Sequence, residues 1–188
     1  MHALSRFPGR WRLLLTLGVA TLTAPASSVE PFAEAEVKAA FLYNFVHFVR
    51  WPDVARKPGD PFRFCVLDDT LAPLLSKAVQ GENVDNHSLT VTRQIELRNL
   101  AECQILYVGD AVWPVHPELL RRATALRILT VSDIPSFTEK GGMIALIRKR
   151  GRIHPVINMD AIARADLRVS AKLLNLATVV GDDKGGAE

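Results

Sequence analysis

Acidic and hydroxyl side chains stand at the ends of several predicted strands of this chain, together with one lysine. They are Asp68, Asp69, Asp110, Thr130, Ser132 and Lys149. Carboxylates gathered at strand ends could hold Mg²⁺, and an aspartate beside a hydroxyl group and a lysine could accept a phosphoryl group. A simpler hypothesis is that these acids cap the helices that follow the strands, and we favour it.

Other catalytic or metal-binding signatures are missing from the sequence. It contains no GxSxG, HExxH or P-loop motif, so none of the common nucleophile, zinc or phosphate sites is indicated. Four histidines fall on different predicted elements without the spacing of metal ligands: His47, His87, His116 and His154. We therefore predict that the protein is not an enzyme and that it uses no metal or other cofactor.

The first 26 residues have the three parts of a secretory signal peptide. Met1–Arg12 carries three arginines and no acidic residue, Leu13–Ala24 is an apolar run of twelve residues, and Ala24-Pro25-Ala26 is a small-x-small cleavage site. Twelve residues are too few to cross a bilayer, which needs about twenty. We expect cleavage near Ala26 and a mature protein outside the cytoplasm that starts near Ser27. No later segment is long and apolar enough to span a membrane.

Removing this segment also removes the excess of basic charge. The whole chain has 23 basic and 20 acidic residues, and three of its arginines lie in 1–26, which leaves 20 of each sign. A balanced charge gives no support to a nucleic-acid-binding surface. Residues 27–180 have the size of one domain, and the polar, glycine-rich tail 181–188 is expected to be disordered.

The chain has two cysteines, Cys65 and Cys103. An even number of cysteines in an exported protein indicates a disulfide, while two separate buried thiols are the alternative. The two residues fall on the first and third predicted strands, which are neighbours in the common doubly wound order. Neighbouring strands are about 4.8 Å apart, so a disulfide between them needs some stagger.

Hydrophobic periodicity predicts a long helix over 31–51, which Pro52 ends. Further strands are predicted over 62–67, 88–94, 103–108, 127–131, 143–148 and 152–158, and further helices over 71–79, 118–126, 160–165 and 170–177. The alternation of strands and helices indicates a single-domain α/β fold, with a mainly parallel sheet and helices on both faces. The last two strands are joined by Lys149-Arg150-Gly151, which predicts an antiparallel C-terminal hairpin at one edge.

Several of these segments together have the pattern of a known protein family. They are VKAAFLYNFVHFVRWP (37–52), FCVLDD (64–69), CQILYV (103–108), ILTVSD (128–133), Gly141-Gly142-Met143-Ile144, Ile157-Asn158 and SAKLLNLA (170–177). In this order and spacing the chain resembles the YfiR family of exported bacterial proteins. Both cysteines match family cysteines, which favours the disulfide over free thiols. The second cysteine pair of some members is missing here, where Thr138 and Ala145 stand in that region.

The resemblance implies a small periplasmic α/β protein that acts by binding another protein. It implies a repressor that binds the periplasmic domain of an inner-membrane diguanylate cyclase, which lowers cyclic di-GMP and restrains biofilm formation. Such a repressor needs a higher affinity for the inactive state of its partner, and it needs no catalysis. The alternative is a periplasmic small-molecule binding or sensory module for another membrane sensor, with a ligand crevice at the carboxyl ends of the strands.

The long helix supplies the candidate contact residues. Its apolar residues occupy more than one stripe, so one stripe could pack on the sheet and another on a partner. The partner-binding candidates are Leu42, Val49 and Trp51, and a self-complementary patch here also predicts a homodimer. Asn44, a polar residue on a largely apolar helix, and Asp69, at a strand end, are the candidate ligand contacts.

Overall fold

The computed structural model describes residues 31–52, 59–93, 96–109 and 118–181. The predicted signal peptide, Asp110, His116 and the tail from 182 therefore lie outside the described residues. The α-helices are α1 (Pro31–Phe48), α2 (Leu71–Ala78), α3 (Glu118–Ala125), α4 (Met159–Arg164) and α5 (Ala171–Leu174), and η1 (Leu97–Glu102) is a 3₁₀ helix. The strands are β1 (Val49–Arg50), β2 (Phe62–Leu67), β3 (Asn83–Val84), β4 (His87–Thr92), β5 (Ile105–Val108), β6 (Leu129–Ser132), β7 (Ile144–Lys149), β8 (Arg152–Asn158), β9 (Arg168–Val169) and β10 (Thr178–Val180).

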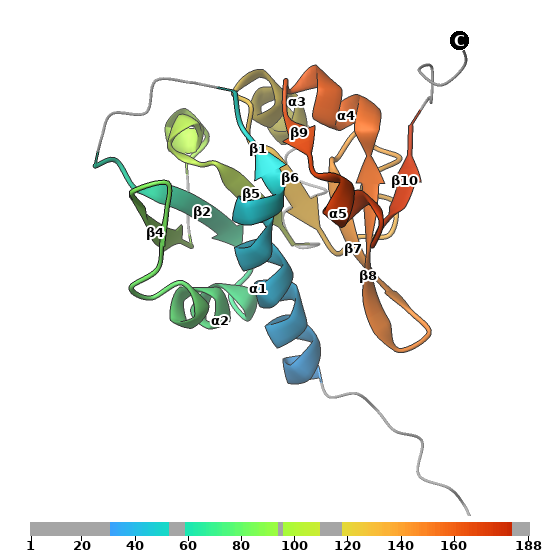
Figure 1. Cartoon of the computed structure of the whole chain (residues 1–188), viewed down its shortest axis with the longest axis horizontal. Helices are drawn as coiled ribbons and strands as arrows, with labels where there is room; N and C mark the ends of the chain where they lie inside the picture. Colours follow the sequence, from blue (N-terminus) through green and yellow to red (C-terminus); the bar gives the residue numbers. More distant parts are fainter. Residues whose placement is uncertain (1–30, 53–58, 94–95, 110–117, 182–188) are drawn as a thin grey trace, which may run out of the picture.

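The ten strands of the described part of the chain form one eight-stranded sheet and one two-stranded sheet, β1–β9. The large sheet has the order β10-β8-β7-β6-β5-β2-β4-β3 (Figure 1). Strands β4, β2, β5, β6 and β7 are parallel to one another. Strand β3 pairs antiparallel with β4, and β7 and β8 form an antiparallel hairpin. This confirms the predicted α/β fold with a mainly parallel sheet and an antiparallel C-terminal hairpin. The five parallel strands have a doubly wound order, which places the first and third of them side by side as expected.

The sequence predicts the hairpin at one edge of the sheet, and this is wrong. Strand β10 pairs in parallel with β8 and forms the edge instead. The last helix was predicted over 170–177, yet α5 ends at Leu174. The residues that follow include Thr178, Val179 and Val180, whose β-branched side chains favour an extended strand over a helix. The carboxyl end of the described chain therefore becomes an edge strand.

Helices cover both faces of the sheet, and each face has its own core. On one face α1, α2, α4 and α5 pack over apolar residues of the strands, such as Phe64, Tyr107 and Val131. On the other face α3 and η1 pack over a second set that includes Cys65 and Leu106. Strand β5 is buried on both faces along its whole length, which explains its continuous apolar sequence.

Helix α1 lies between α2 and the C-terminal elements, and it is shorter than predicted (Figure 1). It ends at Phe48, where the backbone turns into β1 and pairs antiparallel with β9, with Val49 opposite Val169. The backbone N–H of Ser170 donates to the carbonyl of Phe48 at 2.8 Å. None of the helices in the described part of the chain has the length and apolar character of a membrane-spanning segment.

Candidate functional site

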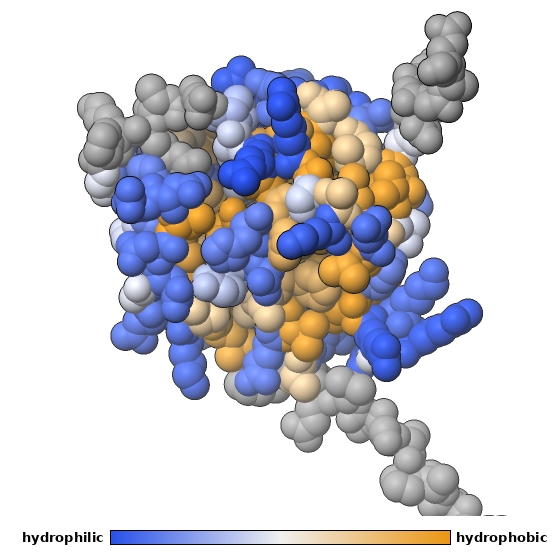
Figure 2. All heavy atoms as spheres, in the orientation of Figure 1, coloured by the Kyte–Doolittle hydropathy of each residue, from blue (hydrophilic) through white to orange (hydrophobic). Residues whose placement is uncertain are grey.

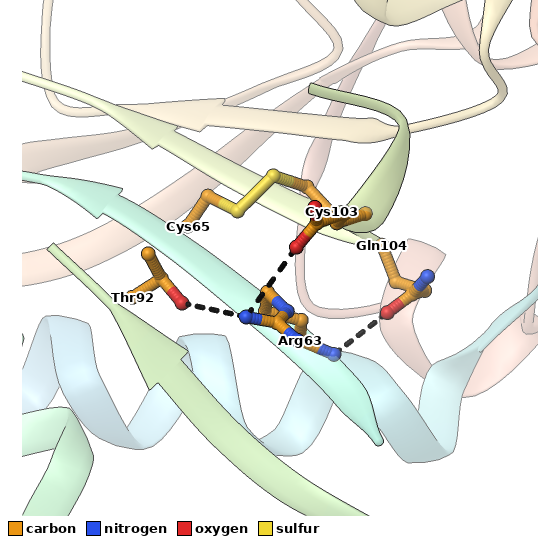
Figure 3. Close-up of a disulfide and its surroundings, with 6 residues drawn as sticks. Arg63, Cys65, Thr92, Cys103 and Gln104 are labelled. Atoms are coloured by element: carbon orange, nitrogen blue, oxygen red, sulfur yellow. Dashed lines mark hydrogen bonds and ion pairs between the residues drawn. A yellow bond between two sulfur atoms is a disulfide. The ribbon is translucent and has the colours of Figure 1, made fainter. Parts of the chain in front are cut away.

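The two cysteines form the predicted disulfide, and it lies inside the second core. Cys65 is in β2 and Cys103 directly follows η1, with 5.8 Å between their Cα atoms and almost no exposure of either side chain (Figure 3). In the register of β2 and β5 the residue opposite Cys65 is Leu106, so Cys103 is staggered by three residues. The bridge therefore joins β2 to the segment just before β5, at a Cα separation that is usual for a disulfide.

Arg63 joins the strands beside the disulfide, and it was not among the predicted site residues. Its Nη1 donates to Oγ1 of Thr92 at 3.3 Å and lies 3.6 Å from Oε2 of Glu102 (Figure 3). Its backbone N–H donates to Oε1 of Gln104 at 2.6 Å, and the N–H of Gln104 donates back to its carbonyl at 2.9 Å. The available signal was the alternation in Phe62-Arg63-Phe64, which places Arg63 on the face of the sheet opposite to two core phenylalanines.

A crevice of about 450 Å³ lies at this amino-terminal end of the parallel strands. Its lining residues are Trp51, Asp60, Pro61, Arg63, Ala101, Glu102, Cys103, Gln104, Leu126 and Arg127. The volume is within the range of small-molecule sites, about 300–1,000 Å³. The ligand crevice was predicted at the carboxyl ends of the strands, so this crevice is at the other end of the sheet from the predicted one.

Trp51, one of the predicted partner contacts, stands at the rim of this crevice. Its ring packs edge-on against Phe62 with 5.1 Å between the ring centroids, and the residue is half-buried. Its indole Nε1 is buried without a hydrogen-bond partner among the described residues. A buried donor without a partner is uncommon in folded proteins. Among the three predicted contact residues, Trp51 therefore has a polar group that the described residues leave without a hydrogen bond.

The prediction that Leu42 and Val49 are free of the core is wrong. Leu42 is 0% exposed and Val49 is 4% exposed, and both belong to the core on the α1 side of the sheet. The apolar residues of this region are covered by other segments of the same chain, since α1 packs on α2 and the sheet and β1 pairs with β9. Neither side chain is accessible to a partner while the domain is folded.

The two predicted ligand contacts are exposed and lie apart from the crevice. Asn44 uses its Nδ2 to donate to the carbonyl of Ala40 in its own helix at 2.7 Å. Asp69 lies in the turn before α2, and its neighbour Asp68 has the capping role. Oδ1 of Asp68 accepts from the backbone N–H groups of Thr70 at 2.9 Å and Leu71 at 2.7 Å. This supports the interpretation of the strand-end acids as helix caps.

The hydroxyl groups of β6 are likewise used by the fold. Oγ1 of Thr130 accepts from the backbone N–H of Met143 at 3.1 Å. Oγ of Ser132 donates to the carbonyl of Val108 at 2.7 Å. Both residues are buried, and Lys149 lies on the β7–β8 hairpin. No cluster of three or more metal-ligating side chains occurs among the described residues, and Asp110, the acceptor in the phosphoryl hypothesis, lies outside them.

Lys38 links α1 to the carboxyl end of β6 through a small ion-pair network. Its Nζ lies 2.7 Å from Oδ2 of Asp133 and 2.8 Å from Oε1 of Glu34, and Arg148 lies 3.6 Å from the other oxygen of Glu34. Burial alone would lower the pKa of Lys38, but the hydrogen bonds to Asp133 and Glu34 outweigh it and raise the pKa above the ordinary value. This network holds the N-terminal helix on the sheet.

Several solved structures are similar to this chain at low sequence identity. A conserved domain protein from Vibrio cholerae is similar, with a TM-score of 0.52 and 11% identity, over 79% of this chain and 60% of that chain. An ABC domain in complex with L-Trp from Streptococcus pneumoniae has a TM-score of 0.47 and 9% identity, over 78% of this chain and 60% of its own. A ligand-free substrate-binding protein with adhesive properties from Clostridium difficile has the same two values, over 65% of this chain and 55% of its own. At these identities the likeness concerns the fold alone.

The comparison with protein families is more specific. No curated protein sequence matches this chain. The sequence model of the YfiR/HmsC-like family, in contrast, matches residues 35–178, which run from α1 to the first residue of β10. That match takes in both cysteines, Trp51 and every strand of the large sheet apart from the last two residues of β10. The chain is therefore a member of the YfiR/HmsC-like family.

Proposed function

We propose that this protein is a periplasmic repressor that binds the periplasmic domain of an inner-membrane diguanylate cyclase and holds it inactive. Membership in the YfiR/HmsC-like family, over residues 35–178, is the observation that carries the proposal, because this family is one of periplasmic, non-catalytic regulators. A cyclase held in its inactive state would make less cyclic di-GMP, and biofilm formation would fall. The buried disulfide is consistent with export to an oxidising compartment.

The proposed domain organisation follows from the same location. Residues 1–26 would be removed on export, residues 27–180 would form the regulatory domain, and 181–188 would be a disordered tail. The domain would act without chemistry, since a repressor only has to bind the inactive state of its partner more tightly than the active state. A shift of the partner from mostly active to mostly inactive needs a preference of about 10⁴-fold.

We propose the open edge at β10 as the contact surface for the cyclase, in place of Leu42 and Val49. Leu176 is 63% exposed and Val179 is 50% exposed, which makes them the most exposed large apolar side chains of the described residues. Figure 2 shows hydrophobic atoms gathered where Figure 1 places β10. One edge of β10 has no strand beside it among the described residues, and such an edge can pair with a strand of another protein.

The proposal is tested by capturing the partner from the cell envelope. The processed protein is cross-linked in the periplasm, and captured membrane proteins are identified by mass spectrometry. A cyclase with a periplasmic domain is expected with the natural protein and to be lost with Val179→Glu. Val37→Glu is the matched control, because Val37 is 43% exposed on α1, and it should still capture the cyclase. Capture of a different class of sensor, or of none, would count against the repressor proposal.

A second candidate function is binding of a small molecule in the crevice beside the disulfide. The observation that favours it is a cavity of about 450 Å³ lined by Trp51 and by two arginines, Arg63 and Arg127. The Nε1 of Trp51 has no hydrogen-bond partner among the described residues. A ligand here could modulate binding of the protein partner. The indole N–H resonance of Trp51 in a nuclear magnetic resonance titration with periplasmic extract would report such a ligand, and a resonance that does not move would exclude it.

A further inference from the structure

The β7–β8 hairpin extends beyond the strands that flank it, although its inner part still packs on the cores through Leu146, Ile147 and Ile153. Strand β6 pairs with β7 only at Ile144 and Ala145, and β10 pairs with β8 only from Val156 to Asn158. The distal part of the hairpin, from Leu146 to Pro155, therefore pairs only with itself. Figure 1 shows it extending beyond the other strands, on the same side of the molecule as the first turns of α1.

The tip of this ribbon carries a dense cluster of exposed cations. Four of five consecutive residues are basic and exposed: Arg148, Lys149, Arg150 and Arg152. Glu34 lies 3.6 Å from Arg148, but no acidic side chain of the described residues forms an ion pair with the other three. Figure 2 shows strongly hydrophilic side chains projecting where Figure 1 places the hairpin. The cluster contrasts with the balanced charge of the chain after residue 26.

The residues at the tip are unfavourable for the turn and the strand pairing that they form. Lys149 and Arg152 are directly opposite one another in the antiparallel ladder, where like charges repel. The turn residues Arg150 and Gly151 both have positive φ, 51° and 77°, which is the geometry of a type I′ turn. That turn favours Asn-Gly or Asp-Gly, and arginine is strained in it. Local rules that are broken together in this way indicate a functional requirement for positive charge.

The shape of the cluster favours a flat anionic surface as the binding partner. The cations are on long side chains at a convex tip, and Arg148 and Lys149 point to opposite faces of the ribbon because successive strand residues alternate. An anionic plane facing the tip can be reached at the same time by cations on both faces of the ribbon. We propose that this hairpin docks the protein onto bilayer surfaces rich in anionic phospholipid. Docking would confine it beside membrane proteins, whichever of them it regulates.

The test measures binding of the processed protein to phospholipid vesicles by co-sedimentation. The natural protein should bind vesicles with about one third phosphatidylglycerol in phosphatidylcholine, and should not bind pure phosphatidylcholine. Binding should weaken as NaCl rises from about 50 mM to about 300 mM. The triple variant Lys149→Gln/Arg150→Asn/Arg152→Gln should lose about a hundredfold in affinity, since each cation near an anionic surface contributes about fivefold.

Two comparisons separate a specific role of the hairpin from a general effect of charge. The control Lys77→Gln/Arg122→Gln/Lys172→Gln removes the same charge from three exposed positions on α2, α3 and α5, and its binding should fall much less. The hairpin variant should unfold at the same or a higher temperature than the natural protein, because Asn-Gly suits the turn and the repulsion is removed. Equal losses in the two triples, or equal binding to both kinds of vesicle, would overturn the proposal. Unchanged vesicle binding by the hairpin variant, with loss of a captured protein, would assign the hairpin to a protein contact instead.

Discussion

The Nζ of Lys38 in α1 lies 2.7 Å from Oδ2 of Asp133, which directly follows β6 and is 95 residues away in sequence. The side chain of Lys38 is 12% exposed, and it also pairs with Glu34. This contact closes the fold between the N-terminal helix and the carboxyl end of a central strand. Because it joins distant segments, its loss should affect the stability of the whole domain.

Replacing Lys38 with methionine should lower the free energy of unfolding by about 1–3 kcal/mol, since two partly buried carboxylates lose their shared cation. Urea unfolding of the processed protein measures the change. Lys77→Met on the exposed side of α2 is the control, and it should change stability by less than about 0.5 kcal/mol. The same loss in both variants would show that the Lys38–Asp133 contact contributes little.

The contribution of Lys38 should also depend on pH in a defined direction. Its pKa in the folded protein lies above the ordinary value of 10.5. The stabilisation is therefore complete below that ordinary value and is lost as the pH rises through the raised pKa. The difference in stability between the natural protein and Lys38→Met should be full at about pH 9 and reduced at about pH 12. A difference that vanishes on the neutral side of pH 9 would contradict this assignment.

Removing the disulfide should destabilise the protein without abolishing the fold of its strands. The bridge closes 38 residues, which corresponds to about 4 kcal/mol in the chain-entropy model. The double variant Cys65→Ala/Cys103→Ala should therefore unfold at clearly lower urea than the natural protein. Reduction of the natural protein should give the same shift. Labelling of both thiols in native, unreduced protein from the periplasm would show that the bridge does not form.

The burial of Leu42 predicts a large effect for a mutation that an exposed residue would tolerate. Leu42→Ala should cost about 2–5 kcal/mol, because it leaves a cavity in the core between α1 and the sheet. Val37→Ala in the same helix removes an exposed side chain and should cost less than about 0.5 kcal/mol. Val49→Glu should unfold the domain, since it buries an unpaired charge. A stable, folded Val49→Glu protein would place Val49 on the surface.

Export is predicted from residues 1–26 and has a direct measurement. Fractionation of cells should recover the protein in the periplasm, and mass spectrometry should give an amino terminus near Ser27. The expected result follows from the basic, apolar and small-x-small parts of this segment. Full-length protein with Met1–Ala26 intact, recovered from the cytosol, would remove the basis for a periplasmic function.

Much of the fold could be predicted because local signals were strong where strands are buried. The bounds of β2 and β8 agree with the predicted strands over 62–67 and 152–158, since apolar runs are bordered there by turn residues. Strand β10 was missed because Thr178–Val180 is only three residues long and follows an apolar helical segment. Its pairing with β8 is a long-range contact that no local pattern encodes.

The candidate site was harder to predict than the fold. The pairing of Cys65 with Cys103 could be inferred, because their number, the strand order and the family pattern agreed. The burial of Leu42 and Val49 could not be predicted, because the sequence of an apolar stripe is the same whether a partner or the protein itself covers it. Here both residues lie in the protein's own core, and Val49 pairs with Val169 of the C-terminal strand β9.

The most direct test of the proposed function measures cyclic di-GMP in living cells. Deleting the gene should raise cyclic di-GMP and biofilm, and the natural gene supplied in trans should reverse both. The rise should disappear when the cyclase captured by cross-linking is deleted as well, because the repressor would then have no target. Unchanged cyclic di-GMP in the single deletion, or a rise that persists without that cyclase, would contradict the account.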